Sequence, residues 1–278
     1  MAAIQALKKQ LRGVRSTQKL TKAMRTVSTV KYAKLSKLYG EFNEYGRQCA
    51  QLLARFGAAF GAQVREADPL APAAVLVMAS NKGMCGSFNA EILNFALEEI
   101  AKLDRPLLVP CGKKAAAFFK GKHLPVEKEA VLDDVPTFAA SSALLDELLA
   151  WRKCGKASKI YVIYPRYINM LQQEPTITEL FPASDAAGDE LLLCVPDQDT
   201  VAETLAANVF RAMFYGLVMQ AAIGAQAATL MTMRAAFDTA TEYCEELEGQ
   251  INRLRQSMVT ASVIETRADT ENQEGRVS

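Results

Sequence analysis

Histidine is almost absent from this chain of 278 residues, since His123 is the only one. Metal sites and catalytic triads that need several histidines are therefore excluded. The six cysteines are far apart and include no C-x-x-C pair, which indicates reduced thiols and argues against a disulfide framework or a zinc site. We predict no catalytic residue, no metal site and no cofactor.

Long hydrophobic runs are also missing. The Ala-rich stretch 214–233 comes nearest to the roughly 18–20 apolar residues that a membrane span needs, but Gln220 and Gln226 interrupt it. We therefore expect no membrane span, and the basic residues that begin at once argue against a signal peptide. The net charge of +1 gives no information about partners.

Proline is absent from residues 2–60, and the apolar residues there fall three and four positions apart. This spacing is typical of a coiled-coil seam, so a long helix that faces another helix is predicted. At about 1.5 Å per residue, the helix would be on the order of 80 Å long. The seam residues are Leu35, Leu38, Phe42, Tyr45, Cys49, Leu52 and Phe56.

Before Lys34, positions extrapolated from the same register are mixed. Val14 and Met24 are apolar, but Thr17, Thr21, Ser28 and Lys31 are small or polar. Basic residues surround them, and no acidic residue occurs before Glu41. Such a helix suits acidic or changing surroundings, although a solvated basic face is the simpler interpretation. The basic residues are Lys8, Lys9, Arg12, Arg15, Lys19, Lys22, Arg25, Lys31, Lys34 and Lys37.

The middle of the chain alternates between predicted strands and helices, which favours a small α/β domain with a mainly parallel sheet. Expected strands are 73–79, 107–109, 160–164 and 172–178, with a further edge strand at 191–195. Expected helices are 91–103, 113–119 and 141–152. Asp133 and Asp134 are interpreted as turn residues before Val135-Pro136.

No proline follows Pro196, and helical spacing resumes from Asp199 to about Glu265. The phase of this pattern is expected to slip once between Cys244 and Leu247. The predicted fold is α/β: an antiparallel coiled coil of long N- and C-terminal helices with an inserted small α/β (Rossmann-like) domain. The domains are the first helix (1–61), the α/β domain (73–195), the second helix (199–266) and a polar tail expected to fray (267–278).

The sequence leaves two other functions open. The turn 80–89 follows a strand and precedes a helix, as phosphate-binding loops do, but Gly83 and Gly86 form neither a G-x-G-x-x-G nor a Walker pattern. Gly112-Lys113 also lacks a correctly spaced preceding glycine. A nucleotide-binding enzyme with coiled-coil arms remains an alternative. The basic helix could bind nucleic acid, but few aromatic residues accompany it.

Five segments resemble the gamma-subunit family of rotary F-type ATP synthases. Residues 16–24 (S-T-Q-K-L-T-K-A-M) with Lys31 resemble its N-terminal signature, and 81–89 its R-G-L-C-G-x-x-N loop. Residues 167–176 are similar to its I-N…P-T segment. The last two segments are 226–238, with its Q-A-A pattern, and 252–260, with N-x-x-R-Q-x-x-x-T.

The resemblance implies a central-stalk subunit that turns inside the hexamer of alpha and beta subunits and couples ion flow to ATP synthesis or hydrolysis. Expected partners are the alpha3beta3 hexamer, the epsilon subunit and the c-ring, at the cytoplasmic face of a bacterial membrane. A divergent rotor working mainly in ATP-driven ion pumping is the alternative. Expected contacts with the hexamer are Lys19, Lys22, Met24, Arg25, Lys31, Lys82, Met84, Asn252, Arg255, Gln256 and Thr260.

Four positions depart from the family pattern. Where the family has Ser-Glu before Gln-Ala-Ala and an arginine after it, this chain has Gly224-Ala225 and Thr229. Ser262 replaces an acidic residue of the family's upper rotor catch. The resemblance therefore implies an orthodox lower bearing and an altered upper catch.

Overall fold

The computed structural model describes residues 2–64, 71–180 and 198–274. Two helices account for both ends of the chain: α1 (Ala2–Val64) and α5 (Gln198–Glu274). The absence of proline explains why each is uninterrupted, because proline inside a helix removes a hydrogen bond and clashes with the preceding turn. The chain divides into two compact units, one of residues 1–26 and 233–278 and the other of residues 27–232.

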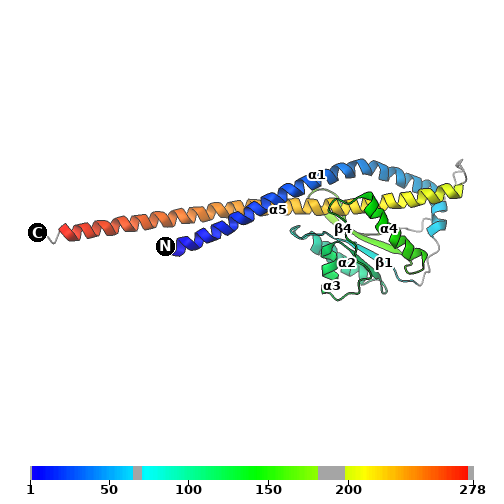
Figure 1. Cartoon of the computed structure of the whole chain (residues 1–278), viewed down its shortest axis with the longest axis horizontal. Helices are drawn as coiled ribbons and strands as arrows, with labels where there is room; N and C mark the ends of the chain where they lie inside the picture. Colours follow the sequence, from blue (N-terminus) through cyan, green and yellow to red (C-terminus); the bar gives the residue numbers. More distant parts are fainter. Residues whose placement is uncertain (1, 65–70, 181–197, 275–278) are drawn as a thin grey trace. The chain divides into compact units, whose positions relative to one another are not determined.

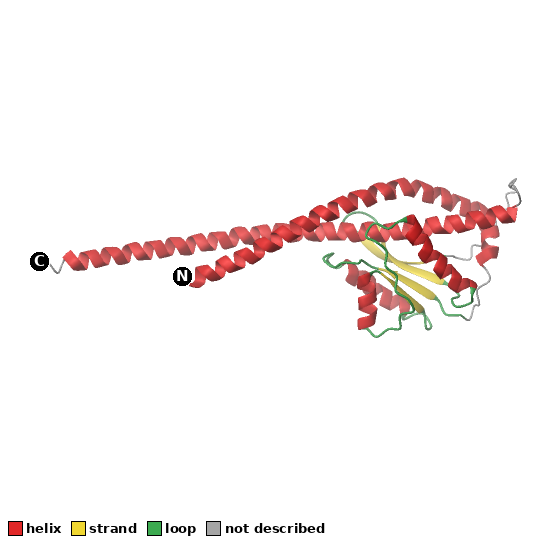
Figure 2. Ribbon diagram, in the orientation of Figure 1, coloured by secondary structure: helices red, strands yellow, loops and turns green. Residues whose placement is uncertain are grey.

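The second unit contains a four-stranded sheet in the order β2-β1-β3-β4 (Figures 1 and 2). β1 (Ala74–Met78) pairs in parallel with both β2 (Leu107–Cys111) and β3 (Ile160–Tyr167). β4 (Gln173–Glu179) is antiparallel to β3. The sheet is therefore mixed, with a parallel centre and one antiparallel edge strand. The strand expected at 191–195 lies outside the described residues.

Helices cover both faces of this sheet. Ala74, Leu76 and Met78 of β1 point into one core with α4 (Phe138–Lys153) and the first part of α5. Val75 and Val77 point into the other core with α2 (Phe88–Ile100) and α3 (Lys113–Gly121). A strand buried on both faces has to be apolar throughout, which explains its unbroken run of apolar residues. We call residues 71–180 the α/β lobe.

Helix boundaries differ from the sequence predictions where local chemistry decides them. α4 begins three residues earlier than expected, because the hydroxyl of Thr137 accepts a hydrogen bond from the backbone N–H of Ala140 at 3.3 Å and caps the helix. α1 continues to Val64, beyond the expected end at residue 61. α5 continues to Glu274, into the stretch that was expected to fray from residue 267. No glycine or proline lies between Gly249 and Gly275 to stop it.

In the first unit, α1 contacts α5 in reverse order along the chain. Leu11 is buried with Cys244 and Leu247, while Gln18 Nε2 donates a hydrogen bond to the Thr241 hydroxyl at 2.7 Å. Cys244 and Leu247 thus share one cluster, and the predicted phase slip between them is wrong. In the second unit, Leu35 is buried with Tyr215, Met219 and Ile223 of α5.

Among the described residues, the helix Ala207–Ile264 is long and apolar enough to cross a membrane by length and composition, since it contains an 18-residue window with a mean hydropathy of 1.2. The sequence led us to expect no membrane span here, so this helix is more apolar than expected. The observation is weak evidence for a span, because the core helix of a soluble protein meets the same criterion. Phe214, Met219 and Ile223 of this helix are indeed buried within the protein.

Candidate functional site

The face that α1 turns toward α5 differs in part from the predicted seam. One predicted stripe is confirmed, that of Val14, Thr21, Ser28, Leu35 and Phe42. Thr21 and Ser28 are only 6% and 4% exposed, and Leu35 is fully buried. The second predicted stripe is wrong at its ends. Thr17 is exposed and Tyr45 is 45% exposed. Leu52 and Phe56 have side chains outside the described set.

Next to the second predicted stripe, the neighbouring positions are half-buried as well and contain long polar side chains. Gln18 bonds to Thr241, the guanidinium of Arg25 lies 4.8 Å from the centre of the Phe237 ring, and the Tyr32 hydroxyl lies 2.8 Å from that of Tyr167. Each residue covers apolar surface with its stem and uses a specific partner for its polar end. A search for apolar spacing therefore selects the adjacent positions instead.

Most of the predicted contact residues on α1 and α5 face solvent. Lys19 and Lys22 are exposed, whereas Met24 is half-buried and Arg25 packs on Phe237. Further along α5, the exposed set consists of Asn252, Arg255, Gln256 and Thr260. The first group lies beside the part of α5 near Phe237 and Thr241, so the structure does not bring the two groups together.

Exposed apolar side chains accompany these residues. On α1 they are Leu20, Val27 and Val30, between half and two-thirds exposed. On α5 they are Leu254, Met258, Val259, Val263 and Ile264. Apolar side chains at such helical spacing are typical of a surface that another protein covers.

The turn between β1 and α2 is held by a network of hydrogen bonds. The Asn89 amide donates to the Ser80 hydroxyl at 2.8 Å and to the Cys85 sulfur at 3.0 Å. Cys85 is buried against Phe88 and Ala225, so it packs as a small apolar residue. Met84 lies at the tip with a positive φ of 66° and is 53% exposed. The turn thus presents Met84 outward.

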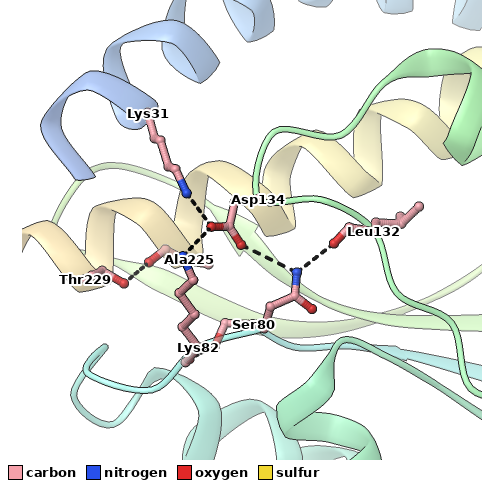
Figure 3. Close-up of polar contacts among 8 residues, drawn as sticks. Lys31, Ser80, Lys82, Leu132, Asp134, Ala225 and Thr229 are labelled. Atoms are coloured by element: carbon pink, nitrogen blue, oxygen red, sulfur yellow. Dashed lines mark hydrogen bonds and ion pairs between the residues drawn. The ribbon is translucent and has the colours of Figure 1, made fainter. Parts of the chain in front are cut away.

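Two of the predicted contact lysines meet a carboxylate of the chain itself. Lys31 Nζ of α1 lies 2.5 Å from Oδ2 of Asp134, and Lys82 Nζ lies 3.3 Å from the same oxygen. Figure 3 shows Lys31 reaching from α1 and Lys82 from the β1–α2 turn. Asn81 completes the group, since its amide lies 3.5 Å from Oδ1 of Asp134 and donates to the Leu132 carbonyl at 2.7 Å. We call Lys31, Asn81, Lys82 and Asp134 the Asp134 cluster.

The environment of Asp134 favours its charged form. Burial by itself raises the pKa of this carboxyl, but the hydrogen bond and charge of Lys31, followed by those of Lys82, outweigh burial and lower the pKa. The Lys31 and Asp134 side chains are only 28% and 18% exposed, so their charge-assisted hydrogen bond is worth about 1.5–3 kcal/mol. Lys82 is 65% exposed, and its ion pair adds only about 0–1 kcal/mol.

Asp134 was missed by sequence reasoning, which interpreted it as a turn residue. A single acidic residue before Val-Pro carries no signal of its own, because its partners lie about 50 and 100 positions away. Among the described residues, no group of three His, Cys, Asp or Glu side chains is placed to hold a metal ion.

The positions that depart from the family pattern do not share one site. Ala225 is buried against Cys85 and Phe88 of the α/β lobe, and the Thr229 hydroxyl donates within α5 to the Ala225 carbonyl at 2.8 Å. Both belong to residues 27–232, whereas Ser262 belongs to the other unit. Ala225 therefore contacts the α/β lobe, whereas the Thr229 side chain is bonded within α5, so these two positions are not grouped with Ser262 in one upper catch.

Comparisons with known proteins agree with this architecture. A family model described as ATP synthase matches residues 3–268. The ATP synthase gamma chain of Symbiobacterium thermophilum is 28% identical over 274 residues, covering 94% of this chain and 95% of the relative. That of Desulforudis audaxviator is 29% identical over 292 aligned residues, covering 95% and 97%.

A solved structure shares the fold at low sequence identity. It is a chain from a cryo-EM structure of the Euglena gracilis mitochondrial ATP synthase rotor, with a TM-score of 0.65 and 15% identity, covering 93% of this chain and 99% of that one. The family match extends over nearly the whole chain, and full-length relatives carry the same subunit name. The chain therefore belongs to the ATP synthase family, as one of its gamma subunits.

Proposed function

We propose that this gamma subunit works as the rotor of a bacterial F-type ATP synthase, turning inside an alpha3beta3 hexamer and joined to an epsilon subunit and a c-ring. It is a non-catalytic subunit, peripheral to the cytoplasmic face of the cell membrane. The observation that carries the proposal is the pair of uninterrupted helices α1 and α5, with basic and apolar side chains left on their outer faces.

Rotation requires an asymmetric shaft, and paired helices of this kind supply one. We propose that α1 and α5 wind into an antiparallel coiled coil, with the Rossmann-like α/β domain inserted between them. The domain limits proposed from the sequence (1–61, 73–195, 199–266 and 267–278) follow this division. The reverse order of contacts, from Leu11 with Leu247 to Leu35 with Met219, supports the antiparallel arrangement.

We propose that exposed residues of the shaft meet the hexamer. Cationic side chains would meet acidic surfaces, and exposed ion pairs worth about 0–1 kcal/mol each would allow one surface to slide past another. Met24 and Met84 would add apolar contact. The proposed contact residues are Lys19, Lys22, Met24, Arg25, Lys82, Met84, Asn252, Arg255, Gln256 and Thr260. Lys31 is half-buried against Asp134, and we assign it a role within the chain.

Coupling would follow from differential contact. A rotor face that binds one conformation of a catalytic site more tightly than the others shifts the population of that site toward it. As the face moves to the next site, the preference moves with it. The rotor thus changes nucleotide affinity without binding nucleotide itself.

The isolated chain is expected to hydrolyse no ATP and to bind neither ATP nor NAD, because no residues for that chemistry are predicted. Mixed with its alpha and beta subunits, it should give an assembled complex with ATPase activity. Isothermal titration and a coupled ATPase assay measure these outcomes, with alpha and beta subunits alone as the control. Robust hydrolysis by the isolated chain would contradict the proposal.

A further inference from the structure

The α/β lobe and α1 are connected by side chains from adjacent positions of the helix. Lys31 forms the ion pair with Asp134, in the segment between β2 and α4, and Tyr32 shares a hydrogen bond with Tyr167 at the end of β3. The Tyr39 ring also meets the Tyr167 ring edge-on at 6.4 Å. These contacts lie within the unit of residues 27–232. They join parts of the chain about 100 or more positions apart.

The Asp134 cluster is tied into the lobe as well as to the helix. The Asn81 amide binds the Leu132 carbonyl, and its side-chain oxygen accepts a hydrogen bond from the Lys113 backbone N–H at 3.3 Å, where α3 begins. Lys82 adds a second cation to the Asp134 carboxylate. A displacement of Lys31 is therefore resisted by the β1–α2 turn, the segment before α4 and the start of α3.

We propose that Asp134 is a positioning residue for torque transmission: it fixes α1 to the α/β lobe through Lys31 and so stiffens the rotor against twisting between them. This inference rests on the proposed rotor function. Apolar packing between α1 and α5 is non-directional and tolerates sliding. A partly buried charge-assisted hydrogen bond has a defined geometry and resists displacement across the helix axis. The Asp134 cluster thus supplies the resistance to displacement that the apolar contacts between α1 and α5 lack.

The test compares Asp134→Asn with Asp133→Asn in the complete complex in membrane vesicles. Asp133 is adjacent and exposed and makes none of the cluster's contacts. Asp134→Asn is expected to leave unloaded ATP hydrolysis unchanged and to lower the number of ions pumped per ATP against an opposing gradient by at least about twofold. Asp133→Asn should match the wild type.

Angular fluctuations test stiffness directly. A bead attached to the exposed Cys154 of the lobe, with Cys194 replaced by serine, should show a broader angular distribution during each pause in the Asp134→Asn complex. If Asp134→Asn fails to assemble, Lys31→Met supplies the same test, since it leaves the hydrogen bonds of Asn81 intact. The double variant should be no worse than either single one, because both remove the same connection.

The outcomes separate the two proposals. If the wild-type and Asp133→Asn complexes fail to rotate, the rotor function is wrong. If they rotate and Asp134→Asn pumps against the gradient and fluctuates as they do, only the role of Asp134 is wrong. If Lys31→Met is defective and Asp134→Asn is not, the role of Asp134 is wrong. Lys31 would then contact the hexamer, because Asp134→Asn leaves Lys31 free to make that contact.

Discussion

Replacing Gly112 by alanine is expected to lower the free energy of unfolding of the chain by about 3–5 kcal/mol. Gly112 lies between β2 and α3 with a φ of 106°, a region that residues with a Cβ rarely adopt. An added Cβ would lie 2.2 Å from the backbone oxygen of Ala79, at the end of β1. The positive φ and the contact with the Ala79 oxygen both involve backbone atoms. No side chain can move aside to relieve them, so the backbone itself would have to move.

Urea unfolding followed by fluorescence measures this effect, because Trp151 of α4 is the only tryptophan and packs against the core of the α/β lobe. Gly121→Ala is the matched control, since nothing lies within 4 Å of a Cβ built at Gly121, a helical residue of α3. Alanine there should stabilise the chain by up to about 1 kcal/mol. Equal unfolding midpoints for the two variants would contradict the argument.

Phe214→Ala is expected to destabilise the chain by about 3–5 kcal/mol, the usual cost of removing a buried phenylalanine ring. Phe214 of α5 is fully buried in the core that β1 and β3 share with α4. Its removal would leave a cavity where the long C-terminal helix meets the sheet. The variant should therefore loosen the attachment of α5 to the lobe as well as lower stability.

Phe138→Ala is the matched control for Phe214→Ala. Phe138 begins α4, is 42% exposed and meets the Tyr215 ring edge-on at 5.5 Å. Its loss should cost only about 0.5–1.5 kcal/mol, the worth of one aromatic pair. The same fluorescence measurement compares the two variants, and a larger loss for Phe138→Ala would show that the core has been misassigned.

The long helices and the buried central strand were predictable because single, local rules govern them. Absent prolines define α1 and α5, and an unbroken apolar run defines β1. Small seam residues such as Thr21 and Ser28 were also placed correctly, because the heptad spacing continues from Leu35. These features depend on neighbours in sequence.

Features decided by tertiary contacts were not predictable. Arg25 and Tyr32 occupy the seam because Phe237 and Tyr167 lie opposite them, which spacing alone does not reveal. Gly112 was considered for phosphate binding, but its position is explained by the approach of the Ala79 backbone. Asp134 likewise gains its partners only when distant segments meet.

Rotation of single complexes tests the central claim most directly. The hexamer would be fixed to a surface through its beta subunits, and a bead would be attached to Cys154 of the gamma subunit, which is exposed. On addition of ATP, the bead should turn in one direction, with one pause for each catalytic site. Sustained ATP hydrolysis by complexes whose bead does not turn would contradict the account.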